Sequence, residues 1–198
     1  MTQISAQTVK RLPQYLNYLK TRPGNGPMNI SARQIADALG LGEIQVRKDL
    51  SAVSACGKPR IGYLIEDLIA DISAFLGLGK NCDAVLVGAG NLGSALMYYP
   101  GFAELGVRIA AAFDTHPVHD GVLQASGLAE WCSVHQPSVG IIAVPASEAQ
   151  SVCDELVGFG VQALWNFAPT HLRVPGGVVL KNEDLAASLA VLMQSVAR

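Results

Sequence analysis

The chain has 198 residues, of which 50% are hydrophobic and 15% are charged. This composition supplies enough apolar side chains for a packed core, and it excludes an intrinsically disordered protein. No stretch reaches the roughly 18 uncharged apolar residues that a membrane span needs, and the N-terminal sequence MTQISAQTVKRLPQ lacks the apolar run of a secretory signal. We therefore expect a cytoplasmic protein without a membrane partner.

The formal net charge of -2 conceals two oppositely charged parts. Residues 1–60 contain nine basic and three acidic side chains, a net charge of +6. Residues 61–198 contain five basic and thirteen acidic side chains, a net charge of -8. This asymmetry predicts two domains with different partners, and the partner of the first is expected to be a polyanion.

Residues 5–21, SAQTVKRLPQYLNYLKT, predict an amphipathic helix whose inward side chains are Leu12, Tyr15, Leu16 and Leu19. The stretch NISARQIADALGLGEIQVRKDLSAV, residues 29–53, predicts two short helices around a turn. Its residues Ser31 and Gln34 fit a capping box, and Gly40-Leu41-Gly42 permits the turn. Such a pair is typical of a helix-turn-helix, whose second helix enters the major groove of DNA.

The second helix of the pair is predicted to begin near Glu43, with Ile44, Val46 and Leu50 buried. Residues 56–63, CGKPRIGY, predict a small β-turn that carries two cations, as in the wing of a winged helix. Long cations reach base edges or phosphates, and a serine donates to either. The predicted DNA-binding residues are Arg11, Arg47, Lys48, Ser51, Lys58 and Arg60.

The four cysteines form no C-x-x-C pair, a distribution that argues against a structural metal and a disulfide framework. We expect no metal site and reduced cysteines that serve packing. Cys56 is the exception, because Lys58 and Arg60 would favour its thiolate, and the sequence leaves open whether it is redox-active.

From Tyr63 to Leu78 apolar residues recur at helical spacing, which predicts a connecting helix and a domain boundary near Gly77 to Lys80. Beyond it, runs that are apolar on both faces alternate with helical segments. These runs are AVLVG, GVRIAAAFD, SVGIIAVP, VQALWNFAP and GGVVL. The alternation predicts an α/β, Rossmann-like, doubly wound parallel sheet after an all-α or winged helix-turn-helix domain.

The stretch LVGAGNLG, residues 86–93, ends the first of these strands with a G-x-G-x-x-G pattern. Gly88 permits a tight turn, Gly90 lets the backbone approach a pyrophosphate, and Gly93 allows close helix packing. The free N–H groups at the start of the following helix favour phosphate. The predicted cofactor-binding residues of this loop are Gly88, Ala89, Gly90, Asn91, Leu92 and Gly93.

Asp114 ends the next strand, 21 residues after Gly93, where a carboxylate accepts hydrogen bonds from the ribose hydroxyls and repels a 2′-phosphate. We therefore expect NADH or NAD+ as the cofactor rather than NADP(H). Two further strand ends contribute Pro145, Asn166 and Phe167 to the same crevice. Asn166 is a candidate partner of the nicotinamide carboxamide, and Phe167 either lines the site or belongs to the core.

A dehydrogenase needs a proton donor beside its substrate and usually extra chain for a substrate pocket. None of the five tyrosines is followed four residues later by a lysine, so the Tyr-x-x-x-Lys pair of short-chain reductases is missing. His171 remains open as a proton donor, whereas His116 and His119 lie in a Pro/Gly loop that does not favour a metal. Binding without turnover is the favoured interpretation, and no catalytic residue is predicted.

The sequence resembles the Rex family of bacterial redox-sensing transcriptional repressors over nearly its whole length. The similar segments are RLPQYLNYL at 11–19, VRKDLS at 46–51, GK at 57–58, GY at 62–63, LVGAGNLGSAL at 86–96, YPGF at 99–102, AAFD at 111–114 and NFAPTHLRVPGGVVLKNEDL at 166–185. The resemblance implies a homodimer that binds operator DNA through winged-helix domains. It also implies that NADH, in competition with NAD+, binds the Rossmann domain and releases the DNA.

In domain terms, the resemblance implies a DNA-binding domain with its connecting helix at 1–78, an NAD(H)-binding domain at 79–180, and at 181–198 a C-terminal helix exchanged between subunits. Similar residues occupy the family's switch positions. We expect Arg11 to pair with Asp184 in the DNA-binding state and Tyr99 to compete for Asp184 in the other state.

One segment departs from the family pattern. Family members carry an aromatic, glycine-containing segment of the type S-Y-F-G after the recognition helix, whereas this chain has Ser51-Ala52-Val53-Ser54. The operator sequence and affinity are therefore not carried over from the family. Two alternatives remain open: a small NAD-dependent oxidoreductase with an appended DNA-binding domain, and a DNA-binding protein whose Rossmann domain has lost its ligand.

Overall fold

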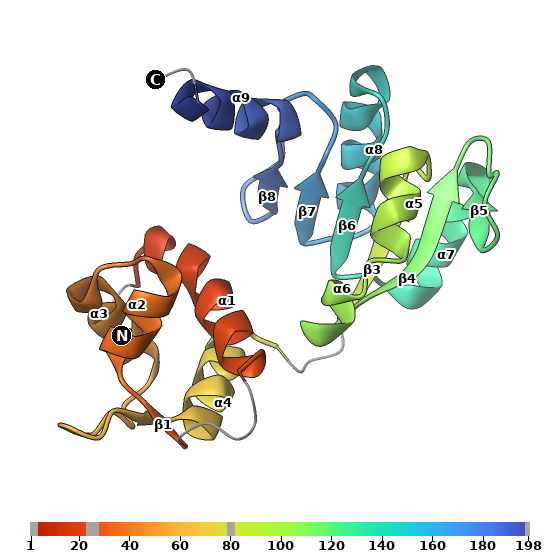
Figure 1. The fold of residues 1–198 in the computed structure, drawn as a ribbon. Coiled ribbons are helices and arrows are strands. Elements are labelled where there is room, and N and C mark those ends of the chain that lie inside the picture. The colour runs from red at the N-terminus through yellow and green to blue at the C-terminus, as the bar shows by residue number, and fades with distance from the viewer. Residues whose placement is uncertain (1–3, 23–27, 79–81, 197–198) are drawn as a thin grey trace. The chain divides into compact units, whose positions relative to one another are not determined.

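The computed structural model describes residues 4–22, 28–78 and 82–196 (Figure 1). The chain divides into two compact units, Met1–Lys80 and Asn81–Arg198, because most contacts between residues fall within one unit or the other. Each unit has its own hydrophobic core.

The first unit is a helical domain with a short hairpin. Its helices are α1 (Ala6–Lys20), α2 (Ala32–Leu39), α3 (Glu43–Val53) and α4 (Ile65–Phe75). All four inward residues predicted for α1 are buried, and they pack with side chains from α2, α3 and α4. The capping box of Ser31 and Gln34 is confirmed, and Gly40 ends α2 in the left-handed conformation at φ +65°. The helix-turn-helix prediction for α2 and α3 is thereby confirmed.

The wing is a tight turn at residues 58–62 that leads into β2 (Tyr63–Leu64), and β2 pairs antiparallel with β1 (Asn29–Ile30). Lys58 and Gly62 exchange backbone hydrogen bonds of 2.9 Å in both directions, and Arg60 lies in the turn between them at φ +66°. A side chain on Gly62 would overlap the backbone carbonyl of Ile30, so only glycine fits this close approach. The turn therefore projects two cations from a fixed backbone.

The second unit contains a six-stranded parallel sheet in the order β5-β4-β3-β6-β7-β8. Its strands are β3 (Cys82–Val87), β4 (Val107–Asp114), β5 (Val122–Gln124), β6 (Val139–Ile142), β7 (Ala163–Asn166) and β8 (Val179–Asn182). Counted from β3, this is the order 3-2-1-4-5-6 of dinucleotide-binding folds. The Rossmann-like fold class is confirmed, although β5 was not among the predicted strands.

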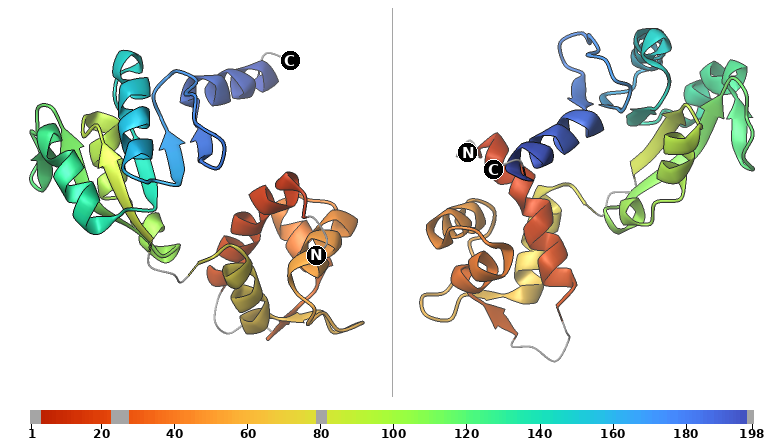
Figure 2. Two further views of the ribbon diagram at one scale, coloured as in Figure 1. Left: turned by 180° about the vertical axis from the view of Figure 1, so that it is seen from behind. Right: turned by 45° about the horizontal axis from the view of Figure 1, so that its top comes forward.

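Helices cover both faces of this sheet (Figures 1 and 2). The helical elements of the unit are α5 (Asn91–Met97), α6 (Gly101–Glu104), a 3-10 turn (Ala125–Gly127), α7 (Leu128–His135), α8 (Ala146–Gly158) and α9 (Leu185–Val196). Residues of α7 and α8 pack on one face, and residues of α5 pack on the other. In contrast, α9 follows β8 and extends away from the sheet (Figure 1).

Candidate functional site

A cavity of about 780 Å³ opens at the carboxyl ends of the central strands in the second unit. Val87 ends β3 and Gly88 follows it, Asp114 ends β4, and Val144 follows β6. Between β3 and β6 the strand order reverses, and ligands of open parallel sheets bind at this switch point.

The glycine-rich loop between β3 and α5 forms one wall of the cavity. Gly88 has φ +95°, and a Cβ there would lie 2.5 Å from the carbonyl oxygen of Ala143. A Cβ on Gly93 would overlap the carbonyl oxygen of Gly88, so this glycine lets α5 pack against the loop. Gly90 lines the cavity, and its Cβ position has no neighbour within 4 Å. That open space is what a pyrophosphate approaching the backbone requires.

Asp114 is fixed by two backbone N–H groups. Its Oδ2 accepts from Ala89 at 2.7 Å, and its Oδ1 accepts from His116 at 2.8 Å. Burial alone would raise the pKa of Asp114, but the N–H groups of His116 and Ala89 outweigh it and hold the pKa below its ordinary value. The carboxylate is therefore ionised near neutral pH, with remaining lone pairs available to ribose hydroxyls.

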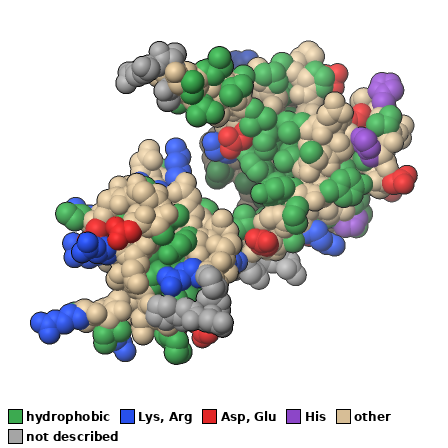
Figure 3. Space-filling model, in the orientation of Figure 1, with side chains coloured by type: hydrophobic (Ala, Val, Ile, Leu, Met, Phe, Trp, Pro, Cys, Tyr) green, Lys and Arg blue, Asp and Glu red, His purple; other side chains and the backbone are tan. Residues whose placement is uncertain are grey.

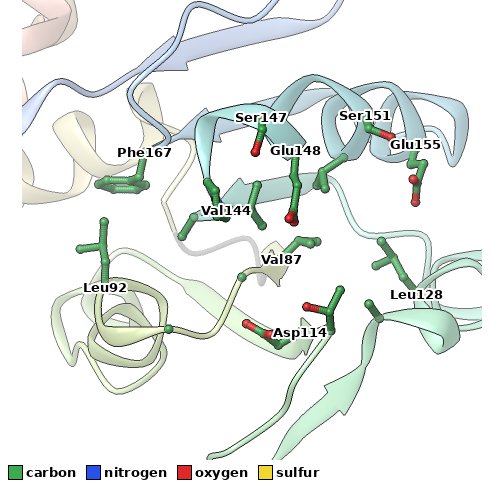
Figure 4. Close-up of a pocket in the computed structure, with 17 residues that line it drawn as sticks. Val87, Leu92, Asp114, Leu128, Val144, Ser147, Glu148, Ser151, Glu155 and Phe167 are labelled. Atoms are coloured by element: carbon green, nitrogen blue, oxygen red, sulfur yellow. The ribbon is translucent and has the colours of Figure 1, made fainter.

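The remaining walls differ from one end of the cavity to the other (Figure 4). Phe167 and Leu92 lie at one end, and Leu128 and Glu155 lie at the other, while Asp114 and Glu148 face each other across the middle. Among the described residues that line the cavity, none is Lys or Arg. An added 2′-phosphate would meet carboxylates and no cation there, which favours NAD(H) over NADP(H).

The structure brings six of the predicted cofactor residues to the cavity: Gly88, Gly90, Leu92, Asp114, Pro145 and Phe167. The other four are placed differently. Ala89 is buried and holds Asp114, Asn91 begins α5, and Gly93 serves packing. Asn166 is fully buried, and its side chain bonds Ala168, Thr170 and Asn182. Its amide is thus engaged within the protein, and a bond to the nicotinamide stays a prediction.

Sequence reasoning missed the contribution of α8. This helix lines the cavity with Ser147, Glu148, Ser151, Val152 and Glu155. Their spacing places them on one helical face directly after the end of β6, and this pattern is visible in the sequence.

Phe167 also belongs to a chain of aromatic rings. Its ring centroid lies 4.6 Å from that of Trp165, which lies 5.7 Å from Phe102, which lies 5.0 Å from Tyr99. Trp165 Nε1 donates to Glu183 Oε1 at 3.1 Å. Glu183 is the residue directly before Asp184. Phe167 is therefore connected through Trp165 to Glu183, and through Trp165 and Phe102 to Tyr99.

In the first unit, the outward face of α3 and the wing carry the predicted DNA-binding side chains. Figure 3 shows Lys and Arg side chains beside α3 and at the end of the wing. Arg47, Lys48, Ser51, Lys58 and Arg60 are all exposed. Ser51 Oγ donates to the backbone oxygen of Lys48 at 3.0 Å, so the hydrogen that was predicted to bond DNA is engaged within α3, and its donation to DNA stays a prediction.

Ile44 was predicted to be buried, and this prediction is wrong. Its side chain is 64% exposed, whereas Val46 and Leu50 are fully buried as expected. Positions two residues apart are about 200° apart around a helix, so Ile44 and Val46 do not face the same core.

Arg11 is placed differently from the other predicted DNA-binding residues. Its Nε and Nη2 donate to Asp49 of α3 at 2.7 and 2.9 Å. With the amide oxygen of Gln45 turned toward it, Arg11 Nη1 donates to that oxygen at 2.8 Å. The guanidinium thus joins α1 to α3, and its part in DNA binding or in a switch stays a prediction.

The other two predicted switch residues lie in the second unit. Tyr99 is exposed and packs its ring on Phe102. Asp184 Oδ1 accepts from the backbone N–H of Ala187 at 2.8 Å, so it caps the start of α9. The pairing of Asp184 with Arg11 or Tyr99 remains a prediction.

The cysteines are free: Cys56 is exposed, and burial raises the pKa of the Cys132 and Cys153 thiols. Among the described residues, no three His, Cys, Asp or Glu side chains are grouped as metal ligands. Within the same residues, no helix is both long and apolar enough to span a membrane.

Two family models match the chain, one in each unit. Residues 3–51 match a family described as "Putative DNA-binding protein N-terminus", and residues 80–170 match the "CoA binding domain" family. The second match covers the glycine-rich loop, Asp114 and the ends of β6 and β7.

Relatives match over nearly the full length. The redox-sensing transcriptional repressor Rex of Porphyromonas gingivalis is 39% identical over 198 residues, which cover 96% of this chain and 91% of that protein. The crystal structure of RSP with β-NAD+ and operator DNA has a TM-score of 0.90 and 31% identity, and covers 99% of this chain and 94% of that chain. RSP with β-NADH has a TM-score of 0.86 and 30% identity, with 99% and 95% covered.

The curated relatives are named as transcriptional repressors, which confirms the expectation of a regulator rather than an oxidoreductase. The sequence identity to these relatives and the share of both chains that is covered are higher than proteins need in order to share only a fold. The chain belongs to the Rex family of redox-sensing transcriptional repressors.

Proposed function

We propose that this protein represses transcription as a homodimer, and that it leaves its operator when NADH occupies the cavity of the second unit. The observation that carries the proposal is the presence of two complementary sites in one chain. A helix-turn-helix with exposed cations lies in the first unit, and a cavity with a glycine-rich loop and Asp114 lies in the second. The solved complexes of RSP with β-NAD+ and operator DNA, and with β-NADH, support it.

The residues of the cavity fit a dinucleotide. The open Cβ position of Gly90 leaves room for the pyrophosphate, and Asp114 accepts from the adenosine ribose. The Phe167 end then receives the nicotinamide ring, and the Leu128 end receives the adenine. NADH acts here as a signal, which fits a family whose curated members are named transcriptional repressors.

The DNA site consists of α3 and the wing. We propose that α3 enters the major groove with Arg47, Lys48 and Ser51, and that Lys58 and Arg60 of the wing contact the backbone or the minor groove. A repressor acts where the chromosome is, so we place the protein in the cytoplasm of a bacterium.

The response to NADH is a shift between two arrangements of the dimer. NADH lowers operator affinity only as far as it binds the DNA-free arrangement more tightly than the DNA-bound one. A 100-fold preference corresponds to about 2.7 kcal/mol. We propose that Arg11, Tyr99 and Asp184 exchange partners in this shift.

The test is fluorescence anisotropy of a labelled duplex selected by the protein from a randomised pool. Titration with NADH should release the duplex at fixed salt, and excess NAD+ should move the release midpoint to higher NADH. Fixed salt is needed because phosphate contacts make DNA affinity salt-dependent. A duplex that stays bound at saturating NADH would overturn the sensor proposal, and steady NADH consumption with a carbonyl substrate would favour an oxidoreductase.

A further inference from the structure

The side chain of Ile44 is exposed beside polar and basic side chains of α3, among them Gln45 and Lys48, and Glu43 lies next to it and 3.9 Å from Arg47. Ile44 is 64% exposed although α3 offers a buried face, which Val46 and Leu50 occupy completely. Leaving a large aliphatic side chain in water forgoes its hydrophobic stabilisation. A ligand that contacts this face of α3 would remove Ile44 from water.

The surroundings of Ile44 indicate what this ligand is. Arg47, Lys48 and Ser51 follow it at intervals of three, four and seven residues, so the four side chains share one helical face. Two of these neighbours are cations, which suits a polyanion and disfavours an apolar protein surface. Ile44 also lies in the first turn of α3, because the helix begins at Glu43.

The N-terminal residues of a recognition helix contact base edges in the major groove. The apolar feature that base edges present there is the C5-methyl group of thymine, and aliphatic side chains recognise it. The side chain of Ile44 has no hydrogen-bonding group, so it cannot recognise the polar edge of a guanine or bind a phosphate.

We propose that Ile44 reads a thymine in each operator half-site by packing against its methyl group. The inference rests on the proposed function, since it requires α3 to enter the major groove. Arg47 and Lys48 bind phosphates and donate hydrogen bonds to bases. Ile44 adds specificity for thymine at one base pair, where it contacts the methyl group rather than a hydrogen-bonding group.

Replacing thymine by uracil removes this methyl group and nothing else. In a duplex selected by the wild-type protein, each thymine is replaced by uracil in turn, and the dissociation constant is measured by fluorescence anisotropy at fixed salt. One position per half-site should weaken binding by about fourfold, the fold-change that corresponds to about 0.8 kcal/mol per buried methyl-sized group.

The variant Ile44→Ala should bind the thymine duplex about as weakly as the wild-type protein binds a duplex with uracil at this position in both half-sites, because both subunits carry the substitution. In this variant the same uracil should have no further effect, because the contact is already missing. Alanine at an exposed position has the highest helix propensity, so α3 is expected to remain folded.

Ile61→Ala is the matched control, because Ile61 is an isoleucine of the wing with 56% exposure. This variant should keep the full uracil effect at the position that Ile44 reads. The proposal is overturned if no thymine responds to uracil in the wild-type protein, or if Ile44→Ala keeps the response. Failure of the proposed function looks different, because the protein would then select no duplex from the pool or would not release it with NADH.

Discussion

Asp49 is a buried carboxylate of α3 that is held by three side chains of α1. Thr8 Oγ1 and Tyr15 Oη donate to it at 2.9 and 2.8 Å, and Arg11 binds both of its oxygens. Burial alone would raise the pKa of Asp49, but the hydrogen bonds from Arg11, Tyr15 and Thr8 outweigh it and lower the pKa below 3.8. Burial and the same carboxylate raise the pKa of Tyr15 to about 12. The proposed recognition helix is thus oriented by a charged network.

We expect Asp49→Asn to lower the free energy of unfolding of the first unit by about 3 kcal/mol, because it leaves the largely buried Arg11 guanidinium without an opposite charge. The measurement is hydrogen exchange in α1 and α3, since both tryptophans lie in the second unit. Asp37→Asn is the control. Its carboxylate is exposed, 3.8 Å from Arg33, and the change should cost at most about 0.5 kcal/mol.

The same network predicts a pH dependence. A carboxyl group with a lowered folded pKa contributes stability above its unfolded pKa, near 3.8, and this contribution is lost as the pH falls through the folded value. The wild-type first unit should therefore lose more stability than Asp49→Asn as the pH falls below about 4. Equal acid sensitivity of the two proteins in hydrogen exchange would contradict this assignment.

Asp114 is the second carboxylate with an assigned role, and Asp114→Asn tests it. The variant keeps the shape but loses the charge that accepts from the ribose, so NADH affinity should fall by about 10- to 100-fold. The difference between NADH and NADPH should narrow, because a 2′-phosphate no longer meets this charge. Asp120→Asn, in the exposed loop that follows β4, should leave both affinities unchanged when they are measured by NADH fluorescence.

At the scale of elements, the loop between β3 and α5 uses its glycines for different purposes. A side chain at Gly93 would overlap the protein backbone, whereas a side chain at Gly90 would enter only the open cavity. We therefore expect Gly93→Ala to destabilise the second unit. Gly90→Ala should fold normally and lose NADH binding, because its methyl group occupies space that the pyrophosphate needs.

Thermal unfolding followed by tryptophan fluorescence, together with an NADH titration, separates these two effects. Trp131 and Trp165 both report on the second unit. The assignment of the loop is wrong if Gly90→Ala binds NADH like the wild-type protein, or if it unfolds as early as Gly93→Ala.

Elements whose pattern repeats over several residues were predictable from the sequence. The capping box of Ser31 and Gln34 and the five strands that begin or end apolar runs follow from local chemistry, and the structure confirms them. The edge strand β5 has only three residues, too few for a periodic signal. The hydrogen bonds of Asn166 were not predictable, because they join residues whose approach is set by the pairing of β7 and β8. The types of residue at the strand ends predicted where the cavity lies. Only the tertiary structure shows which of these side chains already form hydrogen bonds within the protein.

At the scale of the whole molecule, α9 is the helix that the rest of the second unit leaves uncovered. Its apolar side chains Leu185, Leu189, Leu192 and Val196 are exposed and recur at the spacing of one helical face. A contiguous apolar surface of this kind on a folded protein marks an interaction site. The sequence showed the amphipathic pattern, but only the structure shows that its own sheet does not cover it. We propose that a second copy of the chain does so in the homodimer.

We expect Leu192→Glu to shift the dimer toward monomers, because a carboxylate buried in an apolar interface has no partner there. Gln194→Glu adds the same charge to an exposed polar position of α9 and should leave the dimer intact. Sedimentation measures the assembly, and anisotropy measures operator affinity. A monomer holds one recognition helix and gains nothing from a second half-site, so operator affinity should fall with the dimer while NADH binding to the cavity persists. A dimeric Leu192→Glu protein would show that another surface joins the subunits and that α9 has a different partner.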